Sequence, residues 1–266
     1  MRITRQNYST DLTDIQWDTI KNFLQSQHTG RPPADRRQII NAIFYVIRTG
    51  CQWRMLPKNF PPWKTVYNNF RLWKINSIWE KIHAALAKKV RKLKGKKSVP
   101  SVLIIDSQTV KSISNVCQSI GYDAGKKTKG RKRHIVVDTL GLIHAIEIHS
   151  ADIQDQDGAK LLLEKLKGFK RLKVIFADSA YKRNGLVDWT KAVLGVLLQP
   201  VLRPAKVKGF VVLPKRWIVE RTFSWLMWYR RNSKDYEKRP DTAETVIYIS
   251  MIQNMLKTLE NKHHRV

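Results

Sequence analysis

The chain has 266 residues, and 50 Lys or Arg against 21 Asp or Glu give it a formal net charge of +29. Two cysteines are too few for a disulfide framework or a cysteine-based zinc site, no apolar run is long enough to span a membrane, and the first residues lack the apolar segment of a secretory signal. Because a charge this large attracts anionic polymers, the composition predicts nucleic acid as the partner.

The first third of the chain has the apolar spacing of helices. Apolar residues recur every three or four positions over residues 11–87, most clearly over 36–48 and again over 63–86. Three prolines within residues 51–62 indicate a loop between these stretches. We therefore predict an all-α module over residues 1–87, followed by a basic linker over residues 88–100.

After residue 100 the pattern changes to short apolar strands alternating with helices. Two of the strands are predicted to form a hairpin, and the later strands are separated by helices, as in βαβ units. This order predicts an α/β domain over residues 101–266, with a mixed β-sheet flanked by helices. The predicted strands are 102–105, 134–137, 142–148, 172–177 and 193–201, and the predicted helices are 157–166, 184–192, 216–231 and 242–259.

Three carboxylates stand in apolar surroundings in a chain that has few acids. Asp106 and Asp178 each follow a predicted strand, and Glu220 lies in a predicted helix. Aspartates at the ends of adjacent parallel strands would lie close together and would raise each other's pKa. A pair of divalent cations relieves that repulsion and supports phosphodiester chemistry. The alternative is that the aspartates are turn or cap residues and that Glu220 is solvated.

Asp138 also follows an apolar strand, but the residues after it are typical of a hairpin turn. We therefore assign it a structural role.

Two groups of polar residues are candidates for DNA contact. The segment 126–134 carries six basic side chains and leads into the predicted sheet, which favours phosphate contact over a merely solvated charge run. The helix predicted from residue 63 has a polar face that could enter a DNA groove, whereas its aromatic residues are expected to be core. The basic side chains are Lys126, Lys127, Lys129, Arg131, Lys132 and Arg133; the polar face has Lys64, Asn68, Asn69 and Arg71; the aromatic residues are Trp63, Tyr67, Phe70 and Trp73.

Six motifs follow one another along the chain: GCQWRMLPKNFPPWKTVYNNFRLW (50–73), IIDSQTVKS (104–112), GYDAGKKTKGRKRHIVVDTLGL (121–142), ADSAYKR (177–183), RWIVERTFSWL (216–226) and RRNSKDYE (230–237). In these motifs and their order the chain resembles the DDE transposases of short bacterial insertion sequences, specifically the insertion-sequence-five group. The resemblance covers nearly the whole chain.

The resemblance implies an RNase H-like catalytic domain whose DDE triad is Asp106, Asp178 and Glu220. These residues would hold two Mg²⁺ ions, for which Mn²⁺ can substitute. Arg216 matches the arginine of a Tyr-Arg-Glu-Lys signature and would contact phosphate.

The chain departs from that signature at two positions. Leu213 stands in place of the tyrosine and Met227 in place of the lysine. Tyr229, Arg230 and Arg231 are the candidates to replace these DNA contacts.

The implied activity is cleavage of the insertion-sequence ends and joining of the 3′-hydroxyls to target DNA. The implied partners are double-stranded DNA, as terminal inverted repeats and as target, and a second copy of the chain in the active complex. A cytoplasmic, nucleoid-associated location in a bacterium is expected. Two alternatives stay open, a catalytically inactive or repurposed DNA-binding relative and a metal-dependent nuclease without strand transfer.

Overall fold

The computed structural model describes residues 8–24, 35–113, 117–182, 185–201 and 215–263. It divides into two compact units. A helical unit comprises residues 1–94, 228–233 and 245–266, and a sheet unit comprises residues 95–227 and 234–244. Among the described residues no helix is long and apolar enough to cross a membrane.

These units differ from the predicted boundaries in two places. The helix that was predicted to end before a linker at residue 88 continues to Leu93 and buries Val90 on the way. The helix at the end of the chain, α8 (Pro240–His263), belongs to the helical unit from Thr245 onward, whereas the prediction placed it in the α/β domain. Apolar spacing predicts that a segment is helical, but it does not show which core the helix joins.

The helical unit is built from helices of different lengths around an apolar and aromatic core. Thr13 and Asp35 cap the first two α-helices by accepting hydrogen bonds from backbone N–H groups of the first turn. Gly50 ends the second helix with φ of 73°, a conformation that glycine adopts without strain. Besides α8, the helices are α1 (Asp14–Ile20), α2 (Arg36–Thr49), α3 (Trp63–Ile75) and α4 (Ile78–Leu93), with 3-10 turns at Lys21–Leu24, Trp53–Met55 and Arg230–Asn232.

The helical spacing predicted over residues 63–86 is divided between α3 and α4. Ser77 lies between the two helices with φ of 53°, so the chain turns there and does not continue as one helix. Phe70 and Trp73 are buried as predicted, and the ring of Trp73 meets that of Trp79 edge-on at 5.5 Å. Tyr67 was predicted to be core but is 38% exposed.

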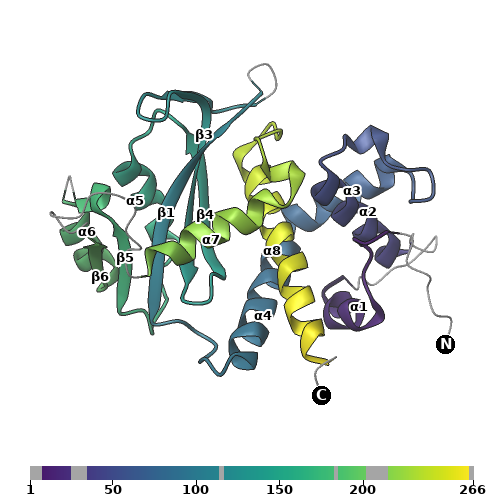
Figure 1. The fold of residues 1–266 in the computed structure, drawn as a ribbon, viewed down its shortest axis with the longest axis horizontal. Coiled ribbons are helices and arrows are strands. Elements are labelled where there is room, and N and C mark those ends of the chain that lie inside the picture. The colour runs from purple at the N-terminus through teal and green to yellow at the C-terminus, as the bar shows by residue number, and fades with distance from the viewer. Residues whose placement is uncertain (1–7, 25–34, 114–116, 183–184, 202–214, 264–266) are drawn as a thin grey trace. The chain divides into compact units, whose positions relative to one another are not determined.

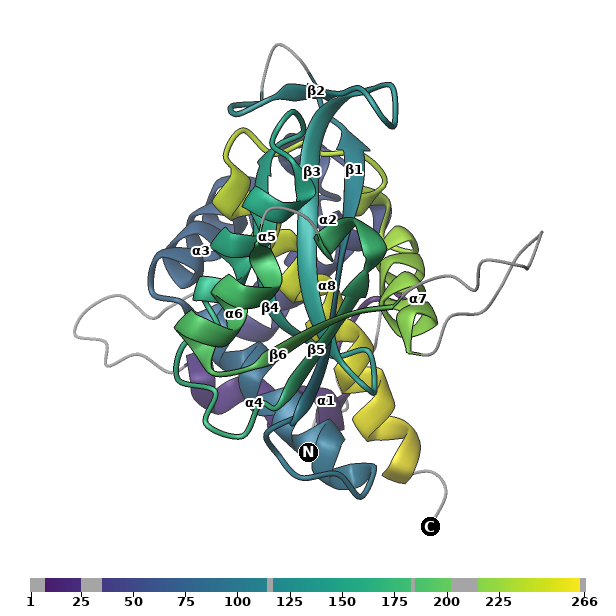
Figure 2. The ribbon, with the colours of Figure 1, turned by 90° about the vertical axis from the view of Figure 1, so that its left-hand side faces the viewer.

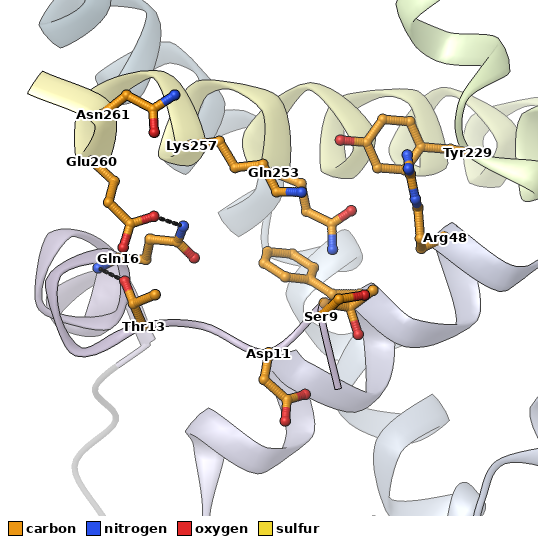
Figure 3. Close-up of a pocket in the computed structure, with 12 residues that line it drawn as sticks. Ser9, Asp11, Thr13, Gln16, Arg48, Tyr229, Gln253, Lys257, Glu260 and Asn261 are labelled. Carbon is orange, nitrogen blue, oxygen red and sulfur yellow. Dashed lines mark hydrogen bonds between the residues drawn. The ribbon is translucent and has the colours of Figure 1, made fainter. Parts of the chain in front are cut away.

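A polar cleft of about 500 Å³ lies within the helical unit (Figure 3). It is lined by the segment around α1, by α2 and by α8. On its walls Gln16 donates to Glu260 at 2.6 Å, and the guanidinium of Arg48 lies 5.2 Å from the ring centroid of Tyr229. None of the predicted catalytic carboxylates lines this cleft.

The sheet unit contains the mixed α/β sheet that was predicted. The strands are β1 (Val102–Lys111), β2 (Gly121–Asp123), β3 (Thr128–Asp138), β4 (Ile143–Ser150), β5 (Val174–Asp178) and β6 (Leu197–Val201). β3 pairs antiparallel with β1, β2 and β4, whereas β5 pairs parallel with β1 and with β6. The order β4-β3-β1-β5-β6 is that of an RNase H-like sheet, which confirms the predicted fold class.

Helices cover both faces of this sheet (Figure 1). α5 (Asp155–Glu164) and α6 (Leu186–Leu194) lie on one face, which Figure 2 shows toward the viewer, and α7 (Arg216–Met227) lies on the other. Side chains of a strand alternate between the two faces, so Leu103 and Ile105 pack in the core beneath α5, and the residues between and after them face α7. Both faces are therefore buried, and polar side chains collect where β1 extends beyond β5.

Candidate active site

The sheet places Asp106 and Asp178 side by side. In the parallel ladder between β1 and β5, each residue of β1 pairs with the residue 72 positions later, beginning with Val102 and Val174. Asp178 also comes 72 positions after Asp106, so these two residues lie at the same level of the two strands. Residues at one level of a parallel pair point to the same face, so both carboxylates belong to the α7 face. The prediction ended the first strand at residue 105, but β1 continues to Lys111, so Asp106 is flanked by strand on both sides.

α7 brings the third predicted carboxylate to the same place. Arg216, in the first turn of this helix, lies between the acids. Its Nη1 is 2.9 Å from Asp178 Oδ2, and its Nη2 is 3.7 Å from Asp106 Oδ2 and 3.4 Å from Glu220 Oε1. The structure thus gathers all four residues that the sequence singled out, with the arginine among the three carboxylates.

The electrostatics differ among these acids. The pKa of Asp106 is raised to about 6, mainly by burial and in part by the charges of Asp178 and Glu220, whereas the Ser107 N–H group and Arg216 act against the rise. The side chain of Asp106 is 17% exposed, whereas that of Glu220 is 51% exposed. Asp106 is therefore the carboxylate that gains most from a nearby cation.

The donor set fits a divalent metal ion in chemistry. Three carboxylates offer only oxygen ligands, which Mg²⁺ prefers. Within the described part of the chain no three His, Cys, Asp or Glu groups already surround a point that could hold a metal ion, and Arg216 occupies the space between these acids. Metal binding would therefore require this arginine to withdraw.

A cleft of about 590 Å³ opens beside the carboxylates. Met227, which stands where the family signature has a lysine, lines the cleft, so this position contributes an apolar wall. Leu213, in place of the signature tyrosine, lies outside the described residues. The cleft residues are Asp106, Ser107, Gln108 and Thr109 of β1, Glu220, Phe223, Ser224 and Met227 of α7, and Asp123, Lys126, Thr128 and Asp155.

Most of the residues that line this cleft were not candidates from the sequence, and Ser107 and Asp155 are among them. The signal for Asp155 was present, because it is one of three aspartates within residues 152–157 of a chain that is poor in acids.

The basic segment 126–134 divides into an exposed and a buried half. Lys126, Lys127 and Lys129 are exposed around the turn that joins β2 and β3. Arg131, Lys132 and Arg133 were predicted to contact phosphate, but β3 begins at Thr128 and buries them.

Internal partners explain that burial. Arg131 pairs with Asp235 at 3.0 Å and donates to the carbonyl oxygens of Glu237 and Lys238. Lys132 donates to the carbonyl oxygen of Ile153 at 2.9 Å. These contacts give the buried cations structural roles.

The other DNA-contact candidates lie in the helical unit. Lys64, Asn68 and Arg71 are exposed on α3, whereas Asn69 is half-buried and donates to the carbonyl oxygen of Thr65. Arg230 is exposed in the turn after α7.

Two further candidates in that turn are engaged within the helical unit. Arg231 donates to the carbonyl oxygen of Cys51, and Tyr229 is buried beneath Arg48. The structure therefore leaves Arg230 as the most accessible of the three replacements expected for the missing signature residues.

Asp138 has the turn role that was predicted. Its Oδ1 accepts hydrogen bonds from the N–H groups of Leu140 and Leu142, and its Oδ2 lies 3.1 Å from His144. These contacts hold the turn between β3 and β4 together.

Two families of known proteins match the chain. The transposase DDE domain matches residues 97–255, which include all three carboxylates. A family described as a putative transposase of the IS4/5 family matches residues 12–83 in the helical unit.

Individual relatives match over shorter stretches. The putative transposase for insertion sequence element IS402 of Burkholderia cepacia is 30% identical over 121 residues, which are 42% of this chain and 56% of that protein. An uncharacterised 16.2 kDa protein of the same element is 27% identical over 88 residues, which are 30% of this chain and 60% of that protein. The chain thus spans less than two thirds of the length of these relatives.

Among solved structures, the Mos1 transposase paired-end complex with left transposon end is similar at 12% identity. The match covers 88% of this chain and 82% of that one, with a TM-score of 0.26. At so low a score the likeness adds nothing to the fold assignment, which rests on the strand order of the sheet.

Proposed function

Because the chain belongs to the DDE transposase family, whose catalytic domain it matches over residues 97–255, we propose that it cuts the ends of an insertion sequence and joins the freed 3′-hydroxyls to target DNA. The observation that carries this proposal is the convergence of Asp106, Asp178 and Glu220 on Arg216. Like charges placed this close together repel one another, and a role in metal-dependent catalysis would account for the arrangement.

The residues have distinct roles in this proposal. Asp106 and Asp178, at one level of adjacent strands, would hold two Mg²⁺ ions between them, and Glu220 would reach one ion from α7. When bound, such a pair of ions activates the attacking oxygen and stabilises the leaving one. Arg216 would then be released from the carboxylates and would orient the scissile phosphate. Positioning and charge neutralisation account for most of the catalysis in phosphoryl transfer.

DNA would be held by the exposed cations. Lys126, Lys127 and Lys129 belong to the same unit as the carboxylates, and Lys126 also lines their cleft. Contacts from these side chains to phosphates hold DNA without reading its sequence.

Reading of the terminal repeats would fall to the helical unit. Lys64, Asn68 and Arg71 share one exposed face of α3, at the spacing that a recognition helix requires. Arg216, Arg230 and Arg231 complete the proposed DNA-contacting set, and a homodimer would bring two ends together.

Cleavage of the natural flanking DNA tests this function. A plasmid that carries the gene with its flanks is incubated with the full chain and Mg²⁺, and strand breaks are mapped by primer extension. Breaks at matched inverted ends followed by joined products are expected. Asp178→Asn should abolish both, whereas Asp188→Asn, which changes an exposed acid of α6, should cut normally.

The alternatives give different outcomes in the same experiment. Breaks without joined products would identify a nuclease that lacks strand transfer. Tight binding with no breaks in Mg²⁺ or Mn²⁺ would identify a DNA-binding relative. Equal cleavage by Asp178→Asn would show that the carboxylate cluster is not the catalytic centre.

A further inference from the structure

Ser107 links the carboxylate cluster to a second acid in the same cleft. Its backbone N–H donates to Asp106 Oδ1 at 2.8 Å, and its hydroxyl donates to Asp155 Oδ1 at 3.1 Å. Asp155 is the first residue of α5 and lines the cleft together with Asp106. One residue of β1 is thus held to a catalytic carboxylate on one side and to Asp155 on the other.

Asp155 is itself fixed by a buried cation. Lys132 Nζ lies 3.1 Å from Asp155 Oδ1 and donates to the carbonyl oxygen of Ile153 at 2.9 Å. The side chain of Lys132 is only 8% exposed, so it is not available to DNA. Among the carboxylates, its charge lies closest to the Asp155 oxygen that accepts from Ser107, and Asp123 Oδ2 is farther away at 4.0 Å. Lys132 and Asp155 therefore form a rigid anchor below the cleft.

The anchor contacts β1 at Ser107, where the strand is paired on one side only. The parallel ladder between β1 and β5 ends at Ile104. In the described part of the chain, Asp106 and Ser107 therefore pair with β3 on one side of β1 and with no strand on the other. An unsupported strand edge can shift, and a metal site tolerates little displacement of its ligands. The hydrogen bond from Ser107 to Asp155 supplies a tie at this point, within one residue of a catalytic carboxylate.

We propose that Asp155, anchored by Lys132, is a positioning residue that acts through Ser107 to hold Asp106 in the orientation that metal binding requires. The inference rests on the proposed function only in taking Asp106 as a metal ligand. Groups that orient metal ligands typically change metal affinity or activity by about 10- to 100-fold when they are replaced.

Binding of Mn²⁺ without DNA tests the proposal on the full chain. Free Mn²⁺ is measured by electron paramagnetic resonance while the ion is titrated in. Asp155→Ala should weaken binding by about 10- to 100-fold. Asp155→Asn keeps an oxygen that can accept a hydrogen bond from Ser107, so its Mn²⁺ affinity should fall much less. Asp157→Ala is the matched control, because it removes an exposed acid from the same helical turn.

A double substitution distinguishes positioning from direct ligation. Ser107→Ala should weaken Mn²⁺ binding about as much as Asp155→Ala, and the double variant should lose no more than either, since both remove the same tie. Circular dichroism melting would verify that each variant is folded. If Ser107→Ala binds Mn²⁺ normally while Asp155→Asn fails as badly as Asp155→Ala, Asp155 is a ligand and the positioning role is wrong.

The outcomes also separate this inference from the proposed function. An unaltered chain that binds Mn²⁺ but never cuts DNA would refute the transposase function and leave the positioning test intact. An unaltered chain that cuts DNA, with Asp155→Ala matching it in both Mn²⁺ affinity and rate, would refute the positioning role alone. If the unaltered chain binds no Mn²⁺, the positioning role is also refuted, because Asp106 is then not a metal ligand.

Discussion

The guanidinium of Arg216 lies 2.9 Å from Asp178, with Nη1 facing Oδ2. The same side chain comes within 4 Å of Asp106 and Glu220, so one cation neutralises part of a cluster of three anions. Divalent metal ions carry more positive charge than one arginine and would neutralise the three carboxylates more completely. Arg216 and metal ions therefore compete for the same carboxylates, and DNA phosphate offers the arginine an alternative partner once metal is bound.

Arg216→Gln should bind Mn²⁺ more tightly than the unaltered chain. Removal of the competing cation should raise the affinity at least about tenfold, because repulsion between cations a few ångströms apart near a protein surface is worth several kcal/mol and each 1.4 kcal/mol is a tenfold change. DNA cleavage should fall nonetheless, because phosphate loses its partner. Isothermal titration with Mn²⁺ measures the first effect, and Arg239→Gln, which alters an exposed arginine paired with Asp241, is the control. Unchanged or weaker Mn²⁺ binding by Arg216→Gln would refute the competition.

The raised pKa of Asp106 predicts how stability depends on pH in the absence of metal. The folded-state pKa is about 6 against a usual value of 3.8, so between these values the folded chain retains a proton that the unfolded chain has lost. The free energy of unfolding should therefore fall as pH rises from about 4 to 6, by at most about 3 kcal/mol.

Asp106→Asn tests that dependence, because asparagine has no charge to desolvate. In EDTA, urea unfolding should show the variant to be the more stable protein at pH 7.5 and close to the unaltered chain at pH 4. The part of the fall in the free energy of unfolding that Asp106 causes should be absent in the variant. A variant that is less stable at pH 7.5 would mean that the ionised carboxylate stabilises the fold, which reverses the predicted sign.

The meeting of the two proposed catalytic aspartates was predictable from sequence because local pattern and topology point to the same place. Asp106 and Asp178 each follow a run of apolar residues long enough for a buried strand, and the helix between the later strands indicates parallel neighbours. Glu220 stood out by its apolar surroundings, but only the family motif implied that it lies beside the two aspartates. Its helix spacing alone does not show that α7 crosses the sheet at the level of the two aspartates.

The basic segment shows what local pattern cannot reveal. A run such as 126–134 is typical of a solvated or DNA-facing surface, because isolated Lys and Arg are seldom buried. Arg131 is nevertheless fully buried, because it forms an ion pair with Asp235. That partner lies more than 100 residues away in sequence, so the local pattern gives no sign of it. The placement of the later part of α8 in the helical unit depends in the same way on distant contacts.

The buried ion pair between Arg131 and Asp235 should be important for stability. The two side chains are 0% and 1% exposed, and removal of one partner leaves an uncompensated buried charge. Asp235→Asn should lower the free energy of unfolding by about 3–5 kcal/mol. Asp241→Asn, which removes an exposed ion pair with Arg239, should lower it far less. Urea unfolding monitored by tryptophan fluorescence compares them, and equal losses would show that burial does not govern the effect.

The exposed lysines of the β2–β3 turn should matter for DNA binding and not for stability. Replacement of Lys126, Lys127 and Lys129 together by Gln should leave the melting temperature nearly unchanged and weaken DNA binding at all sequences alike. If each contacts one phosphate, the slope of log affinity against log salt should lose about 2.7 in magnitude. The control replaces three exposed lysines beyond α5, Lys167, Lys170 and Lys173. Fluorescence anisotropy across a salt series measures both slopes. If the control loses as much slope as the turn variant, the DNA contact is a general effect of net charge and is not located at this turn.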